Sequence, residues 1–199
     1  PAAEDYRHWL DKNDSLAPDV MEALADSVRA LPIQPLISVV MPVYNPPIEY
    51  LDAAIESLFR QFYTNWELCI ADDASPDEAV RSYLRAAMER DARIKIVFRE
   101  TNGHISQASN SALSLAKGEI VALMDNDDIL PAHALAHIVI AINENPAVEI
   151  IYSDEDKIDE RGLRYEPYFK SDFNYELFLA QNMISHLGVY RRSTIESVG

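Results

Sequence analysis

The stretch Leu123-Met124-Asp125-Asn126-Asp127-Asp128 joins an apolar segment directly to three carboxylates. Residues 119–124 have the apolar pattern of a buried strand, which places the carboxylates at its carboxyl end. Ligands bind at that edge of an open α/β sheet. Carboxylates this close repel one another unless a cation lies among them, and a divalent metal ion that carries a phosphate meets that need. The alternative is a solvated acidic turn before a helix that starts near Pro131.

Strand and helix patterns alternate on both sides of this stretch. Predicted strands cover residues 37–43, 67–71, 94–98, 119–124 and 148–152. Predicted helices lie between them at residues 48–62, 76–90, 105–117 and 131–143. Such alternation is typical of βαβ crossovers, so we expect an α/β fold with a mixed, mostly parallel sheet.

The two ends of the chain depart from this alternation. Residues 1–35 are predicted to form a helical segment and a proline-containing linker, and residues 36–199 the main domain. After residue 154 we expect a short helix at 175–181, a strand at 187–190 and a last helix capped by Ser193. The dense aromatic residues of this part are expected to form mostly a small core under a long loop, with one facing an acceptor. They are Tyr165, Tyr168, Phe169, Phe173, Tyr175 and Phe178.

Composition limits the classes of function. With 199 residues, of which 48% are hydrophobic and 25% charged, the chain fits one globular α/β domain with a substantial core. Its net charge of −16 argues against binding to nucleic acid or to anionic lipid surfaces, because both need basic patches. The one cysteine, Cys69, lies in an apolar run, so we expect a buried, inert thiol in a reducing cytoplasm.

We expect neither a transmembrane segment nor a signal peptide. The longest apolar stretch, residues 134–142, is far too short to cross a bilayer. The chain starts at Pro1 and stops at Gly199, and we expect both ends to be cuts from a longer protein.

Two other predicted strands also end in polar residues. The first strand continues into Tyr44 and Asn45, and the second continues into Asp72-Asp73-Ala74-Ser75. Ser75 or Asp73 could cap the next helix, which explains one polar residue but not both aspartates. Three polar strand ends at one edge predict a composite ligand site. Neither a Gly-x-Gly-x-x-Gly nor a Walker lysine motif occurs, which disfavours dinucleotide and P-loop chemistry and leaves phosphate to metal and side chains.

Together these motifs resemble those of the family 2 glycosyltransferases with the GT-A fold, a Rossmann-like α/β/α sandwich. The resemblance covers residues 36–199, and four motifs stand in the family's order and spacing. They are Ile37 to Asn45, Asp72 to Asp77, Asn102-Gly103 with Ser109-Asn110, and Asp125 to Asp128, which is similar to the family's Asp-x-Asp motif. Tyr152 to Lys157 and Gln181 to Arg192 resemble the bacterial branch that builds O-antigen, rhamnan and capsule polysaccharides.

The resemblance implies a binding site for the base of a nucleotide-sugar donor. Tyr44 would stack on the base, and Asp72 or Asp73 would accept its ring N–H. Arg99 and Asn102 would reach the base or a phosphate, although Arg99 is alternatively a solvated strand end. Two prolines follow Asn45 where the family's first motif often has an acidic residue, which leaves the shape of the base pocket open.

Further donor contacts are implied on the other strand ends. Asn126 would face the ribose or the donor sugar. Asp154 would contact the donor sugar or the acceptor, or cap a helix. The remaining residues implied in donor binding are Pro42, Asn45, Asn110 and Asp125.

The resemblance also implies a site for Mn²⁺ or Mg²⁺. Asp127 would coordinate the ion, and Asp125 would bind it directly or through water. The ion would bridge the two donor phosphates and stabilise the diphosphate leaving group. His186 would be a third ligand, a diphosphate contact or a hydrogen-bonded structural residue. His133 and His137 have metal-like spacing, but the apolar residues around them predict a packing helix.

The implied function is metal-dependent, inverting transfer of a sugar from a nucleotide-diphosphate donor to a growing glycan or a lipid-linked acceptor. We expect it in the cytoplasm, with peripheral attachment to the inner face of the cell membrane through the full-length protein. The carboxylate that deprotonates the acceptor is expected beyond Gly199, so the chain is expected to bind a donor but transfer sugar poorly. The alternative is a non-catalytic nucleotide-sugar-binding module of a larger polysaccharide synthase. A phosphate-accepting receiver domain fits poorly, because the third strand ends in Phe98-Arg99 rather than an aspartate.

Overall fold

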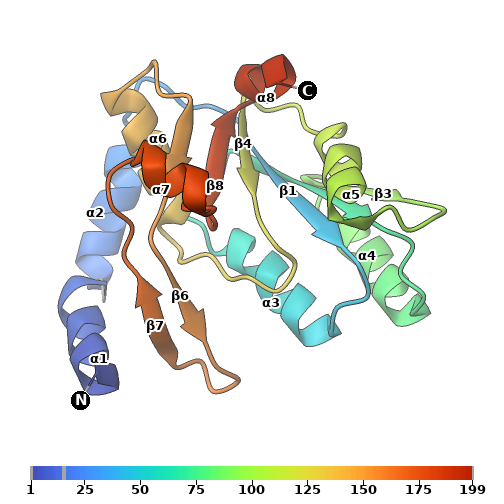
Figure 1. Cartoon of the computed structure of the whole chain (residues 1–199), viewed down its shortest axis with the longest axis horizontal. Helices are drawn as coiled ribbons and strands as arrows, with labels where there is room; N and C mark the ends of the chain where they lie inside the picture. The colour runs from blue at the N-terminus through green and yellow to red at the C-terminus, as the bar shows by residue number, and fades with distance from the viewer. Residues whose placement is uncertain (1, 15–16, 199) are drawn as a thin grey trace.

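The computed structural model describes residues 2–14 and 17–198 (Figure 1). Its helices are α1 Ala2–Asn13, α2 Pro18–Arg29, α3 Ile48–Phe59, α4 Glu78–Arg90, α5 His104–Leu113, α6 Ala134–Glu144, α7 Tyr175–Ala180 and α8 Arg192–Val198. Its strands are β1 Ile37–Val43, β2 Trp66–Asp72, β3 Ile94–Phe98, β4 Ile120–Leu123, β5 Ile150–Tyr152, β6 Glu155–Ile158, β7 Arg164–Tyr168 and β8 Gly188–Arg191. Within the described ranges, each helix is too short or too polar to cross a bilayer.

The main sheet has six strands in the order β3-β2-β1-β4-β8-β5. Strands β3, β2, β1 and β4 are parallel, and β8 runs antiparallel to both of its neighbours. The predicted mixed, mostly parallel sheet is therefore confirmed. The chain turns from one half of the sheet to the other between β1 and β4, which is the place where open α/β sheets bind their ligands.

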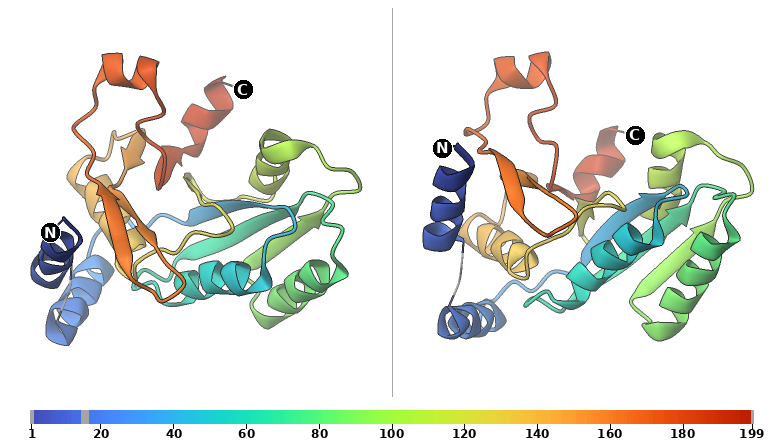
Figure 2. Two further views of the ribbon diagram at one scale, coloured as in Figure 1. Left: turned by 60° about the horizontal axis from the view of Figure 1, so that its bottom comes forward. Right: turned by 90° about the horizontal axis from the view of Figure 1, so that it is seen from below.

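Helices cover both faces of the sheet (Figure 2). One face packs against α3, α4 and α6, whose buried side chains include Leu58, Leu84 and Leu135. The other face packs against α5 through Ala108 and Ala112, whose small side chains let the helix lie close to the strands. Cys69 lies in this second core, and burial raises its pKa to about 12, so the predicted buried thiol is confirmed and stays protonated.

The N-terminal segment forms two helices that contact different parts of the molecule. Helix α2 packs beside α6, whereas α1 packs on β7. The rings of Tyr6 and Trp9 lie against Phe169, and the Tyr6 hydroxyl donates to the Asp156 carboxylate. These contacts tie α1 to the β6–β7 hairpin. The division at residue 35 stays a prediction.

The helix predicted at residues 175–181 is confirmed as α7, but the expectation for the hairpin region and for the aromatic residues was wrong. Strands β6 and β7 form an antiparallel hairpin that was not predicted. The segment that follows, residues 169–187, projects from the sheet and carries α7; we call it the arm (Figure 2). Its aromatic rings do not form a core, since Phe173 and Tyr175 are 58% and 61% exposed. Helix α8 starts at Arg192, so Ser193 lies inside the helix instead of capping it.

The carboxylate of Glu67 joins the amino-terminal ends of several strands. It accepts hydrogen bonds from the Ser38 hydroxyl of β1 at 2.6 Å and from the main-chain N–H groups of Lys117 and Gly118 at 2.5 and 3.2 Å. Lys95 of β3 forms an ion pair with it. Gly118 passes so close to Leu36 and Ser38 that a Cβ atom there would collide with them. Burial acts to raise the pKa of Glu67, but the hydrogen bonds from Lys95, Ser38 and Lys117 together hold it below its usual value.

We predict that Glu67→Gln destabilises the fold at pH 7. The amide turns a donor toward the Lys95 ammonium, which should lower the free energy of unfolding by ~2 kcal/mol and the thermal midpoint by about 4–8 °C. A carboxyl with a lowered folded pKa stabilises above its unfolded pKa, and this contribution is lost as pH falls through the folded pKa. The gap between wild type and variant should therefore narrow on acidification. Denaturant unfolding over a pH series measures it, with the exposed Glu149→Gln as the control; a gap that is independent of pH contradicts the charge argument.

Candidate functional site

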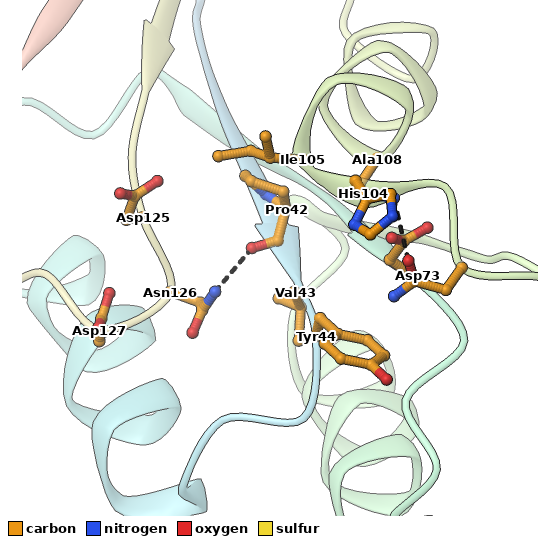
Figure 3. A pocket seen from close by; sticks show the side chains of 11 residues that line it. Pro42, Val43, Tyr44, Asp73, His104, Ile105, Ala108, Asp125, Asn126 and Asp127 are labelled. Atoms are coloured by element: carbon orange, nitrogen blue, oxygen red, sulfur yellow. Dashed lines mark hydrogen bonds between the residues drawn. The ribbon is translucent and has the colours of Figure 1, made fainter.

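A groove of about 390 Å³ lies at the carboxyl ends of β1, β2 and β4 (Figure 3). Seven of the predicted site residues line it, namely Pro42, Tyr44, Asp73, Asn102, Asp125, Asn126 and Asp127. Val43 of β1 also lines the groove, and so do three residues of α5 that were not predicted, namely His104, Ile105 and Ala108. Their place in the chain could have predicted them, because a helix that follows a ligand-binding edge presents its first turn to the ligand.

One wall of the groove is built around a buried ion pair. The Asp73 carboxylate accepts the main-chain N–H of Gly103 at 3.0 and 3.1 Å, and Arg99 Nε lies 2.7 Å from it. Arg99 extends further to the hydroxyl of Ser111 at 2.6 Å. Since Asp73 is 2% exposed and its charge is matched, the pair fixes the start of α5 against the end of β2. Arg99 lies behind the lining instead of reaching into the groove.

Asp72 and Asn45 support the groove from below. Asp72 is fully buried, accepts the N–H of Ser75 at 3.3 Å and lies 3.6 Å from Arg81 Nε, so it does not line the groove. Asn45 has a left-handed φ of 51°, and its N–H donates to the Ser75 hydroxyl at 2.8 Å. Helix α4 is capped by Asp77, which accepts the N–H of its second residue, so neither Ser75 nor Asp73 is the cap.

The opposite wall is the acidic loop after β4. The Asn126 amide donates to the carbonyl of Pro42 at 2.9 Å, which ties this loop to β1 (Figure 3). Asp125 and Asp127 extend from either side of Asn126, and Asp127 is exposed. Tyr44 is 54% exposed at the end of β1, so its ring is free to meet a flat ligand.

His186 lies beside this acidic loop. Its Nε2 is 3.7 Å from Asp125 Oδ2, and its Nδ1 is 3.3 Å from Asp128 Oδ2. One donor atom from each of the three residues falls within 4.8 Å of the others, and carboxylate oxygens with an imidazole nitrogen are a donor set that suits Mn²⁺. Of the three expected metal ligands, the structure thus groups Asp125 and His186, with Asp128 in the place of Asp127. Burial raises the pKa of Asp128, and His186 opposes that shift.

The remaining predicted residues lie outside the groove. Asn110 is exposed on α5, and Asp154 is exposed and accepts the N–H of Lys170 at 2.7 Å. The ring centroids of His133, the residue before α6, and His137 on α6 lie 5.3 Å apart, which fits the packing helix expected there. Gly199, beyond which the catalytic carboxylate was expected, lies outside the described residues.

Comparison with known proteins identifies the family. The profile described as "Glycosyl transferase family 2" matches residues 38–199, and the chain belongs to that family. It is 48% identical over 193 residues to the uncharacterized protein y4gI of Sinorhizobium fredii, covering 97% of this chain and 21% of that protein. It is 32% identical over 199 residues to the O-antigen biosynthesis protein RfbC of Myxococcus xanthus, covering all of this chain and 15% of that protein. The chain therefore spans about a fifth or less of these two relatives.

Solved structures confirm the GT-A fold. The mannosyltransferase PcManGT from Pyrobaculum calidifontis, in complex with GDP-Man and Mn²⁺, has a TM-score of 0.63 and 22% identity, with 90% of this chain and 58% of that chain covered. TarS 1-349 from S. aureus, in complex with UDP-GlcNAc, has a TM-score of 0.65 and 23% identity, with 81% and 46% covered. At 22% and 23% sequence identity, the similarity to these two structures shows a shared fold and no more.

We predict that Asp73→Asn loosens the wall of the groove. The amide cannot neutralise Arg99, so the free energy of unfolding should fall by ~2 kcal/mol. Amide hydrogen exchange should accelerate most around Gly103, where the main-chain N–H loses its charged acceptor. Mass spectrometry of exchanged peptides measures this, with the exposed Asp11→Asn as the control. Unchanged exchange at the start of α5 would contradict the assigned role of the pair.

Proposed function

We propose that the groove binds the nucleotide-diphosphate sugar donor, with Mn²⁺ or Mg²⁺, in an enzyme that transfers the sugar to a growing glycan or a lipid-linked acceptor. The observation that carries this proposal is the charge of the lining. Asp125 and Asp127 face the groove, and none of the described lining residues is a lysine or an arginine. A diphosphate cannot enter beside unmatched carboxylates without a cation between them, and a divalent ion supplies that charge.

Each wall has a part in this proposal. Tyr44 stacks on the base, while Asp73 and Asn102 lie where the polar edge of the base would end. Asn126 stands between the acidic residues and β1, in reach of the ribose or the donor sugar. Asp125, Asp128 and His186 would hold the metal ion, and the exposed Asp127, which lines the groove, would add a further carboxylate. When bound, the ion stabilises the charge that develops on the diphosphate leaving group.

The relatives support the same chemistry. RfbC is named for O-antigen biosynthesis, and the two solved structures hold GDP-Man with Mn²⁺ and UDP-GlcNAc. The inverting outcome, the acceptor, the catalytic base and the cytoplasmic location stay predictions, and so does the alternative of a non-catalytic donor-binding module.

We predict that one nucleoside diphosphate stabilises the chain in a metal-dependent way. Thermal unfolding is followed with UDP, dTDP or GDP, each with Mn²⁺ and with EDTA. A ligand at about 100 times its dissociation constant adds ~2.7 kcal/mol, which raises the midpoint by roughly 5–10 °C. Asp127→Asn should abolish the shift without lowering the midpoint of the free protein, because Asp127 is exposed.

The exposed Asp11→Asn on α1 is the matched control and should keep the whole shift. A shift that survives EDTA would contradict the metal dependence. The absence of a shift with every nucleotide would contradict the donor site itself.

A further inference from the structure

Lys170 is a charged residue buried at the base of the arm. Its side chain is 1% exposed, and its ammonium donates to the Glu155 carboxylate at 3.0 Å. The same ammonium donates to the carbonyls of Ile184 at 2.8 Å and His186 at 2.5 Å. All three ammonium protons therefore have acceptors. Burying an ammonium group is costly unless its protons are hydrogen-bonded, so these three contacts fix where the Lys170 side chain lies.

Lys170 and Glu155 form hydrogen bonds with the main chain of His186, one at its carbonyl and one at its N–H. Glu155 Oε2 accepts the N–H of His186 at 2.9 Å, while the Lys170 ammonium donates to the carbonyl of His186. The next N–H, that of Leu187, donates to the Ser153 hydroxyl at 3.1 Å. The main chain around His186 is thus held by Glu155 of β6, by Ser153 two residues earlier, and by Lys170 near the start of the arm.

These main-chain hydrogen bonds matter because the imidazole of His186 is itself less constrained. The His186 side chain is 45% exposed, and its neighbours Asp125 and Asp128 are 42% and 39% exposed. The position of the imidazole follows from the main chain that carries it, and that main chain is held by Lys170 and Glu155.

We propose that Lys170 and Glu155 are positioning residues that place His186 beside Asp125 and Asp128, and so set the affinity of this site for a divalent metal ion. The inference rests on the metal site of the proposed function. It assigns to an ion pair outside the groove a part in metal binding. Groups that orient a metal ligand typically contribute about 10–100-fold to metal affinity.

The test is a thermodynamic cycle on Mn²⁺ affinity. Free Mn²⁺ is measured by electron paramagnetic resonance in titrations of the protein, alone and with UDP or GDP. Lys170→Met should weaken Mn²⁺ binding by about 10–100-fold. The same substitution made in a His186→Ala protein should change the affinity by less than about threefold, because its effect runs through His186.

Two further variants make the result decisive. Lys157→Met is the matched control, since Lys157 is 64% exposed on the same hairpin and pairs with Glu166; it should bind Mn²⁺ within about twofold of wild type. Glu155→Gln keeps an acceptor for the His186 N–H and removes the charge, so it should weaken binding even if Lys170→Met does not fold.

Either of two outcomes would overturn the positioning role. One is wild-type affinity in both Lys170→Met and Glu155→Gln, and the other is an equal loss in the presence and absence of His186, which a general loosening of the fold would produce. If the wild-type chain takes up no Mn²⁺ with any probe, the metal site of the proposed function is overturned, and this inference with it.

Discussion

The buried carboxylate of Glu67 is the interaction on which the arrangement of the sheet depends. It joins Ser38 of β1, Lys95 of β3 and the turn that begins β4, so it fixes three strands relative to β2 at their amino-terminal ends. Parallel strands advance at the same rate of about 3.3 Å per residue, so a register fixed at one edge determines which residues meet at the other. Asp73 and Asp125 reach the same groove because their strands are aligned far from it.

The two acidic walls of the groove differ in how their charge is compensated. Asp73 is matched inside the protein by Arg99 and a main-chain N–H, and that wall is complete without a ligand. Asp125 and Asp128 have His186 as their neighbour, a residue whose charge depends on protonation. The Asp73 wall therefore needs no ligand to balance its charge. The wall with Asp125 and Asp128, in contrast, presents a negative charge to the solvent. A ligand that carries its own negative charge therefore needs a cation at the second wall, and this asymmetry would orient the proposed donor along the groove.

Local patterns were sufficient to predict the sheet and the acidic edge, because buried parallel strands are apolar along their whole length and their ends are abruptly polar. They failed where structure comes from pairing across a long stretch of chain. The strands of the β6–β7 hairpin are polar and half-exposed, so they carry no apolar alternation, and the aromatic residues beyond them are exposed on the arm. The grouping of Asp128 with His186 was likewise invisible, since it requires β8 to insert beside β4.

The direction of β8 explains how a histidine so late in the chain reaches the groove. In a wholly parallel sheet the residues before a strand lie at the edge opposite the ligand. Strand β8 runs antiparallel, with Gly188 opposite Leu123, so the residues that precede it meet those that follow β4. Strand β5 ends at the same edge, with Tyr152 opposite Gly188, and the chain must leave and return there. Residues 153–187, which contain the β6–β7 hairpin and the arm, form the excursion between these points. A loop of this length would leave the segment that returns to β8 conformationally free. The ion pair of Lys170 and Glu155, at the place where the arm leaves and returns, holds that segment in one position beside the groove.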